Sequence, residues 1–377
     1  MLQENKQPEP IKEYYIAYFD LLGYKQFFET HPEKAGDFLQ VIHEAVSSTG
    51  DYIQAVNSSQ IGVELGKLFI RKKVFSDNIL LCLETTKAAV EYPRFLAFLA
   101  IVADVQRNFV LRYGLSLRGG ITIGEVSFNE DFVFGRGLID AVTLEGTAIY
   151  PRIIVDKSVL TYVRQLHFVK EDDLRKACEI ESHAHSGTHI SDEELEFCNS
   201  IMPAVNMERF YLQWRDLLLF PTVDGAVVLN YLYHFNVSSI FDQPTIEHML
   251  AFIKTFSPDD YQQACNFSSS LNQSSTSSVQ KQQLEQHKTY IIQKINEFGS
   301  YDDLDISKVE EADTRERILK KYLWLLSFHN YVCTVYSIPD CMIKSGSTVD
   351  IRFMKMSVAI FEGNPSPKKQ QKEEQDE

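Results

Sequence analysis

The first 160 residues alternate between strand-like and helix-like segments, and this alternation limits the folds open to the chain. EYYIAYF, from residue 13, is an aromatic and β-branched run typical of a buried strand. KLFIRKKVFSDNILLCLE, from residue 67, is typical of two strands joined by a tight turn at Ser76, Asp77 and Asn78. From Pro93, apolar residues recur at helical spacing.

The pattern continues to residue 156. A helical period is expected after Gly23, through residues 37–48. GLSLRGGITIGEVSF, residues 114–128, predicts two strand segments broken by paired glycines. GRGLIDAVTLEGTAIY, residues 135–150, predicts a helix, and PRIIVD, residues 151–156, a further strand. The order of these elements predicts an α/β (α+β) fold with helices covering a sheet.

The pattern of alternating strand-like and helix-like segments ends at about residue 160. We therefore expect a first domain at residues 13–165 and an extension at residues 166–362. The second part should begin with an acidic, His-containing stretch and a hairpin-like segment. Helices should follow, interrupted by a Ser/Gln-rich stretch at residues 268–283. Residues 1–12 should be flexible and residues 363–377 disordered, since the C-terminal tail has almost no apolar content.

Composition excludes several classes of function. The formal net charge is -15, which disfavours binding to nucleic acid or to an anionic membrane. No apolar run approaches the ~20 residues that span a bilayer, and the polar N-terminus is not a signal peptide. The 6 cysteines show no CxxC spacing, which predicts reduced thiols in the cytoplasm rather than a disulfide framework or a zinc site.

Two aspartates stand where apolar runs end. Asp20 follows the first strand, and Asp77 lies in the turn between the next two. If these strands are neighbours, both carboxylates emerge at one end of the sheet. Like charges at close range cost free energy unless a cation lies between them, and Mg²⁺ is typically bound by one or two carboxylates with water and substrate phosphates. The pair therefore indicates metal-assisted phosphoryl or nucleotidyl transfer.

The alternative is that both acids only form turns, because Asp is common in turns and SDN is good turn chemistry. The near-continuous apolar sequence around each acid favours the metal interpretation. Three histidines, His183, His185 and His189, also lie close together in the chain. They occur in a polar, acidic stretch without companion cysteines, so a solvated loop is favoured over a metal site.

Four motifs resemble those of a known family. FDLLGY (residues 19–24) resembles the first-strand motif of class III nucleotide cyclases, in which an Asp is followed by an apolar residue, a Gly and an aromatic. KVFSDNILL (73–81) resembles their second metal-ligand hairpin, LRGGITIGEV (117–126) their glycine-bearing strand and GRGLIDAVTLE (135–145) the following helix. The core match covers roughly residues 13–156.

The full order of motifs resembles the pyrimidine cyclases of bacterial anti-phage (Pycsar-type) systems. There the same core is followed by PRI, a D-G hairpin like TVDGAVVLNYL (222–232) and a helical Lys-Tyr-x-Trp…His-Asn segment, here KKYLWLLSFHN (320–330). The resemblance implies a ferredoxin-like class III cyclase core with a mainly helical C-terminal extension. In that last segment, Trp324 and His329 are interpreted as core packing rather than catalysis.

The resemblance assigns roles residue by residue. Asp20 and Asp77, with the backbone carbonyl of Leu21, would bind two Mg²⁺ or Mn²⁺ ions. Class III purine cyclases carry an Asn and an Arg at positions that fall on Ile139 and Thr143, which cannot take their place. A cationic stabiliser must come from elsewhere, and Arg118 is the first choice, against the alternative of a surface arginine at a strand end.

Further residues are assigned to substrate binding: Phe19, Lys73, Phe132, Arg136 and Arg152. Lys73 aligns with a base-reading Lys of adenylyl cyclases. The partner Asp of that Lys aligns with Phe132, which cannot accept a hydrogen bond from an exocyclic amine. This departure disfavours adenine and agrees with a pyrimidine base.

The resemblance implies that the chain converts UTP or CTP into cyclic UMP or cyclic CMP with release of diphosphate. Because class III sites form between two chains, it also implies a homodimer. The product would be a second messenger acting on a separate effector in anti-phage defence. Two alternatives stay open: a purine cyclase with a rebuilt site, and a catalytically silent nucleotide-binding or dimerisation module.

Overall fold

The computed structural model describes residues 10–24, 68–86, 91–129, 132–166, 170–222, 224–233, 276–299 and 309–344, with a few single positions between 29 and 44. Most of the helix expected at 37–48 and all of the tail at 363–377 therefore lie outside the described residues. The division of the chain at residue 165 stays a prediction.

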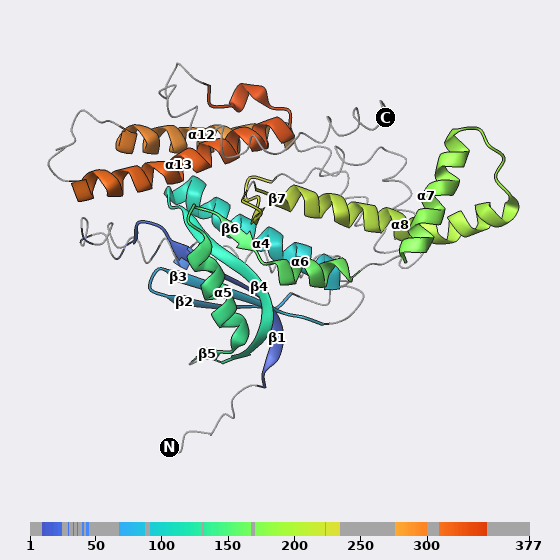
Figure 1. Cartoon of the computed structure of the whole chain (residues 1–377), viewed down its shortest axis with the longest axis horizontal. Helices are drawn as coiled ribbons and strands as arrows, with labels where there is room; N and C mark the ends of the chain where they lie inside the picture. The colour runs from blue at the N-terminus through green and yellow to red at the C-terminus, as the bar shows by residue number, and fades with distance from the viewer. Residues whose placement is uncertain are drawn as a thin grey trace.

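The fold is mixed α/β, as the sequence predicts, and is built on one sheet (Figure 1). The strand order is β2-β3-β1-β4-β6-β8-β7, with β5 attached to β4. All pairs are antiparallel except β4 with β6. The strands are β1 (Lys12–Leu21), β2 (Ile70–Phe75), β3 (Asn78–Glu84), β4 (Leu117–Phe128), β5 (Val133–Phe134), β6 (Ile153–Val155), β7 (Leu219–Pro221) and β8 (Val227–Leu229).

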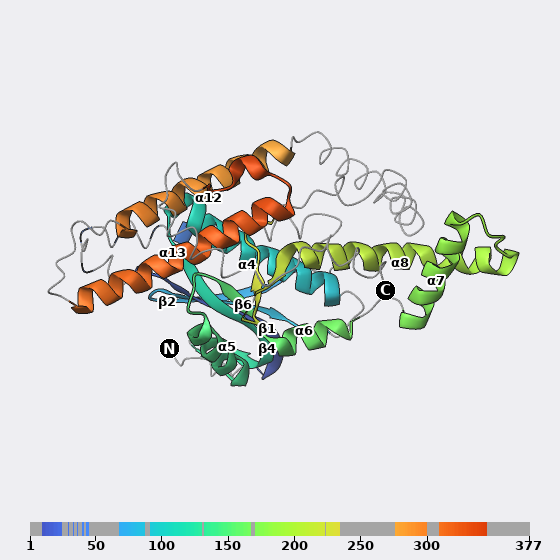
Figure 2. The ribbon, with the colours of Figure 1, turned by 45° about the horizontal axis from the view of Figure 1, so that its top comes forward.

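Helices cover both faces of the sheet and make up most of the C-terminal part (Figures 1 and 2). They are α4 (Glu91–Tyr113), α5 (Arg136–Thr147), α6 (Lys157–Arg164), α7 (Glu171–His185), α8 (Asp192–Leu218), α12 (Thr276–Gly299) and α13 (Val309–Val335), followed by the short 3₁₀ helix η2 (Pro339–Cys341). Among the described residues, no helix is long and apolar enough to cross a membrane.

Strand β1 is the central element of the sheet, because it pairs along its length with both β3 and β4. Alternate side chains point to opposite faces. Tyr15 and Phe19 belong to the main core, where the Tyr15 ring lies 4.9 Å from that of Phe95 in α4. Tyr14 and Ile16 face the smaller core under α5.

Helix α4 is buried almost all round, which is typical of a helix enclosed by other elements. It packs against the sheet on one side and against α8 and α12 on the other. The C-terminal helices therefore complete the main core. Figures 1 and 2 show α12 and α13 lying side by side, whereas the α7–α8 pair extends away from the sheet.

Buried polar groups join α12 to α13. The Tyr231 hydroxyl lies 2.7 Å from His287 Nε2, and His287 Nδ1 lies 3.1 Å from Nδ1 of His329. Nε2 of His329 lies 3.0 Å from the Cys341 carbonyl oxygen in η2. Burial lowers the pKa of His329 to about 4, so its ring is neutral at pH 7. The expected packing of His329 inside the helical segment is confirmed.

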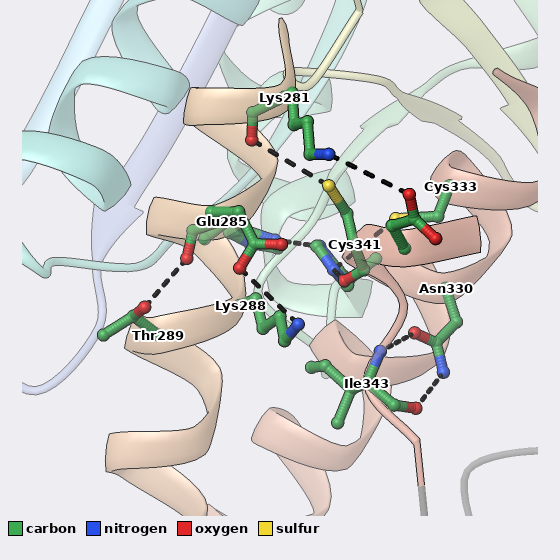
Figure 3. Close-up of polar contacts among 11 residues, drawn as sticks. Lys281, Glu285, Lys288, Thr289, Asn330, Cys333, Cys341 and Ile343 are labelled. Carbon is green, nitrogen blue, oxygen red and sulfur yellow. Dashed lines mark hydrogen bonds and ion pairs between the residues drawn. The ribbon is translucent and has the colours of Figure 1, made fainter. Parts of the chain in front are cut away.

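The chain after η2 is also held by Asn330, as Figure 3 shows. Its Nδ2 donates to the Ile343 carbonyl at 3.1 Å, and its Oδ1 accepts from the Ile343 N–H at 2.8 Å. These two bonds fix the last described segment to α13.

Two strand predictions need correction. Residues 117–128 form one continuous strand, β4, rather than two segments broken by glycines. A side chain at Gly119 would lie 2.6 Å from Phe19 Cβ, so glycine here permits close packing within the ladder. The hairpin-like segment expected after the acidic stretch, ERFYLQWRDLLLFPTVDGAVVLNYL (residues 208–232), is also smaller, because α8 continues to Leu218 and within this segment β7 pairs with β8.

Two helix predictions need correction as well. The stretch expected as a solvated loop contains α7, which includes His183 and His185 in its last turn, although the side chain of His183 is exposed. The Ser/Gln-rich interruption ends earlier than expected, since α12 begins at Thr276.

We predict that Gly137→Ala destabilises the protein, because α5 approaches β1 and β4 most closely at this glycine. An added Cβ would meet Ile16 Cδ1 and would lie 2.9 Å from the Gly124 carbonyl carbon. The expected loss is about 1–3 kcal/mol of unfolding free energy, measured by urea denaturation. Gly146→Ala is the control, because nothing lies within 4 Å of its added Cβ. It should change stability by less than about 1 kcal/mol, and equal stabilities of the two variants would contradict the close docking of α5.

Candidate functional site

The two aspartates meet at one end of the sheet. Asp20, near the end of β1, is paired with Asn78 on β3 and with Arg118 on β4. Asp77 lies in the β2–β3 turn, and its carbonyl accepts the N–H of Leu21 at 3.0 Å. This bond fixes the turn beside the end of β1, and the Asp20 and Asp77 carboxyl groups are close enough to share a hydrogen bond. The ladder thus brings together residues 57 positions apart in the chain.

Local structure explains why Asp77 occupies this place. Ser76 precedes it with a φ of 58°, a left-handed conformation that closes the turn tightly. Nδ2 of Asn78 donates to Asp77 Oδ1 at 3.1 Å, which orients the carboxylate. The SDN triplet therefore forms the turn and also presents an acid, so the two interpretations of the sequence are compatible.

A third carboxylate completes the cluster. Glu145, on the buried face of α5, makes an ion pair with Arg118 Nε at 2.7 Å. The same nitrogen lies 3.2 Å from Asp20 Oδ2. Arg118 is therefore not a surface arginine without partners, because it bridges a strand acid and a helix acid.

The cluster carries more negative than positive charge in a poorly solvated place. Burial raises the pKa of Asp20 to about 6; Arg118 opposes this shift, while Asp77 and Glu145 add to it. Burial also raises the pKa of Glu145; the charge of Arg118 opposes this shift, and that of Asp77 adds to it. Such a cluster is stabilised by an added cation.

The donors fit a hard divalent cation. Asp20 and Asp77 offer carboxylate oxygens, which Mg²⁺ and Mn²⁺ prefer, and the Leu21 carbonyl belongs to the same strand end. Within the part of the chain that the structure describes, no group of three or more His, Cys, Asp or Glu side chains is arranged to hold a metal. The remaining ligands would therefore be backbone, water and substrate oxygens, as is usual for Mg²⁺.

Three of the other sequence-assigned residues lie away from the carboxylates. Phe19 is fully buried in the main core. Arg136 pairs with Asp140 at 2.8 Å near the start of α5, nine residues and roughly 13 Å along the helix from Glu145. Arg152 is buried and pairs with Asp224 at 2.6 Å, so its side chain supports the fold beside β6.

Lys73 and Phe132 have different surroundings. Lys73 pairs with Leu80 in the β2–β3 ladder, which places it on the same face as Tyr18 and Asp20. Its Nζ lies 6.0 Å from the centre of the Phe128 ring. Phe132 is half-exposed between β4 and β5, and its N–H donates to Asn129 Oδ1 at 2.8 Å.

Sequence reasoning missed two charged residues at this site, Glu145 and Lys321. Glu145 follows buried Ala141 by four positions in α5, so the helical period could have placed it on the inner face. Lys321 lies in α13, 203 positions after Arg118. It feels the charges of both Arg118 and Asp20, and although it is the Lys of the Lys-Tyr-x-Trp motif, its place near the site depends on the tertiary structure.

We predict that Asp20→Asn stabilises the metal-free protein at neutral pH. The raised pKa means that ionised Asp20 destabilises the folded state. This loss of stability is absent below pH 4, near the pKa of Asp20 in the unfolded chain, and it grows until the pH passes the folded-state pKa of about 6. After discounting for solvent screening, the variant should gain about 1 kcal/mol at pH 7.5 relative to its effect at pH 4.5. Thermal unfolding in a chelator measures this gain. Asp140→Asn, at an exposed acid of α5, is the control and should show no such gain. A pH-independent effect of Asp20→Asn would contradict the crowding of charge.

No protein-family model and no curated protein sequence matches the chain. Among solved structures, the adenylyl cyclase CyaB from P. aeruginosa aligns with 41% of this chain and 82% of that chain, at 16% identity and a TM-score of 0.31. A class III adenylyl cyclase-like ATP-binding protein from Pseudomonas aeruginosa aligns with 39% of this chain, at 13% identity and a TM-score of 0.28. Only 34% of that second protein is covered. Because both TM-scores are so low, any functional assignment rests on the residues of this chain.

Proposed function

We propose that this protein is a nucleotide cyclase that makes cyclic UMP or cyclic CMP from UTP or CTP and releases diphosphate. The observation that carries the proposal is the pair of adjacent carboxylates, Asp20 and Asp77, at neighbouring strand ends beside Arg118. Two partly buried acids that repel each other destabilise the fold, so their presence is better explained by a cationic ligand than by packing.

Asp20, Asp77 and the Leu21 carbonyl would hold two Mg²⁺ or Mn²⁺ ions. When bound, these ions polarise the α-phosphate and lower the pKa of the ribose 3′-hydroxyl. The 3′-hydroxyl gives up its proton to solvent and its oxygen forms a bond to the α-phosphorus, the bond from that phosphorus to the bridging oxygen breaks, and diphosphate leaves with that electron pair.

Arg118 is the proposed stabiliser of negative charge on the phosphates. Its contacts to Asp20 and Glu145 both use Nε, which orients the guanidinium and leaves its Nη donors for a phosphate oxygen. Glu145 is a positioning residue in this account, because it acts through Arg118.

The pyrimidine assignment has support from two positions. Phe132, where adenylyl cyclases carry an Asp, has no side-chain hydrogen-bond acceptor for an exocyclic amine. Lys73 lies beside the aromatic ring of Phe128, and an ammonium next to an aromatic face suits a carbonyl-bearing base. Which pyrimidine is used is decided by the assay below.

We also propose that the protein works as a homodimer. Several large apolar side chains are exposed around α5 and β5, where a second copy could cover them. They are Phe132 (46% exposed), Phe134 (67%), Ile139 (60%) and Val142 (41%). In such a dimer, base or phosphate contacts would come from the subunit opposite the metal ligands.

The biological role that we propose follows the sequence resemblance alone. The cyclic nucleotide would be a second messenger in the cytoplasm that acts on a separate effector in anti-phage defence. That role implies no binding to nucleic acid or to a membrane.

We predict that Asp20→Asn and Asp77→Asn each lower cyclase turnover by more than about 100-fold without unfolding the protein. The assay incubates purified protein with ATP, GTP, CTP or UTP plus Mn²⁺ and identifies products by mass spectrometry. Asp140→Asn is the control and should keep full activity.

Each product has a defined meaning. A cyclic pyrimidine nucleotide supports the proposal and identifies the base. Cyclic AMP or cyclic GMP would overturn the pyrimidine assignment and retain the mechanism. Full activity of either aspartate variant would overturn the metal assignment, and no product from any substrate would favour a silent nucleotide-binding module.

We predict that Ile139→Glu shifts the protein to monomers and lowers turnover, because a charge on the exposed face of α5 opposes apolar contact. Light scattering after size exclusion measures the mass. Leu195→Glu is the control, since Leu195 is 53% exposed on α8, away from α5. If both variants remain dimeric and active, this face is not the dimer interface.

A further inference from the structure

Helix α13 is fixed against the site by the residues on either side of Arg118. The Tyr322 ring lies edge-on to Tyr290, with 6.1 Å between ring centres. The Tyr290 hydroxyl is 2.8 Å from Ser116 Oγ, and the Ser116 carbonyl accepts the Leu22 N–H at 2.9 Å. One side of α13 is thus tied to the chain that leads into β4 and to the turn after β1.

A second contact lies two residues further along α13. The Trp324 ring stacks on Tyr150 with 6.0 Å between centres. Arg152, which lies over the same two rings, accepts the Gly119 N–H with its carbonyl at 3.0 Å. Ser116 and Gly119 flank Arg118, so the two contacts hold α13 against this part of the site, and Lys321 lies within the electrostatic range of Arg118 and Asp20.

Lys321 differs from the neighbouring lysine of the same helix. Its side chain is half-buried and makes no ion pair or hydrogen bond with the residues that the structure describes. Burial lowers the pKa of its ammonium, the charge of Arg118 lowers it further, and that of Asp20 raises it. Lys320, by contrast, is exposed and pairs with Glu316 at 2.8 Å.

Arg118 and Lys321, the two cationic side chains of the site, therefore differ in their ionic contacts. Arg118 is engaged by two carboxylates, at 3.2 Å and 2.7 Å. Lys321 lies in the field of the same cluster, yet no carboxylate among the described residues neutralises its charge by direct contact. A half-buried ammonium is costly without an anionic partner, and phosphate is an anion that lysine commonly binds as a point charge.

We propose that Lys321, from the C-terminal helical extension, binds a phosphate of the substrate's triphosphate. The substrate identity rests on the proposed function, whereas the phosphate site rests on the placement of Lys321. The extension would then complete the active site of its own chain, in addition to covering the core.

The alternative role for Lys321 is purely structural, as a counter-charge to the acidic cluster. The two roles differ in what they affect: a structural cation changes stability, whereas a phosphate ligand changes the affinity for phosphate. The test therefore compares binding and stability in the same variants.

Inorganic triphosphate, equilibrated with Mg²⁺, is titrated into the full-length protein in the same Mg²⁺ buffer, and binding is measured by calorimetry. We expect Lys321→Gln to weaken binding about 10- to 100-fold, since a charge-assisted bond is lost. Lys321→Arg should retain most of the affinity. The matched control, Lys320→Gln, should bind like the wild type.

Turnover separates this inference from the proposed function. With a nucleotide that the enzyme cyclises, Lys321→Gln should raise KM and leave the choice of base unchanged. If no nucleotide is cyclised but the triphosphate result holds, the phosphate site stands and the cyclase proposal fails. Wild-type affinity for triphosphate in folded Lys321→Gln, or no triphosphate binding by the wild-type protein, would overturn the inference.

Discussion

The double hydrogen-bonded ladder of β1 is the constraint on which the site depends. Because β1 pairs with β3 on one side and with β4 on the other, the position of Asp20 is fixed relative to both Asn78 and Arg118. A shift of one residue in either register would turn Asp20 to the opposite face, into the main core. The apolar side chains of β1 prevent such a shift, since they fill two cores at once.

Charge is concentrated where this ladder ends. Asp20 and Glu145 share one bridging arginine and Asp77 lies beside Asp20, and burial makes the repulsion among the three acids stronger than it would be in water. Cations can relieve this repulsion, and an anionic substrate can then bind to the cations. The arrangement therefore suits a reaction in which metal ions and phosphates enter together, which is the physical basis for the cyclase proposal.

The C-terminal helices contribute residues to the main core. They enclose α4, and the buried His287–His329 pair is hydrogen-bonded within the bundle. Stacking of Trp324 on Tyr150 joins α13 to the connection between α5 and β6, where the Arg152 carbonyl accepts the N–H of Gly119, next to Arg118. Any displacement of α13 would therefore move Lys321 relative to Arg118, so the extension and the site are mechanically linked.

Local patterns in the sequence determined the elements. Period-two and helical spacing predicted β1, β2, β3, α4 and α5. This was possible because such spacing depends only on residues that are close together in the chain. Asp20 and Asp77 could be singled out for the same reason, since an acid that ends an apolar run is visible in the chain itself. The limit of this reasoning appears at Gly119, where a strand break was expected and close packing against β1 instead keeps β4 continuous.

Only the tertiary structure decided how charges are shared between distant segments. The sequence offers both Arg152 and Arg118 as candidate phosphate-binding arginines, yet Asp224 engages the first, whereas Asp20 and Glu145 engage the second. Lys321 follows Arg118 by 203 positions in the chain. It lies near the site because aromatic contacts hold α13 against the end of the sheet. Electrostatic partners depend on separations in space, and these are fixed only when the sheet and its helices have packed.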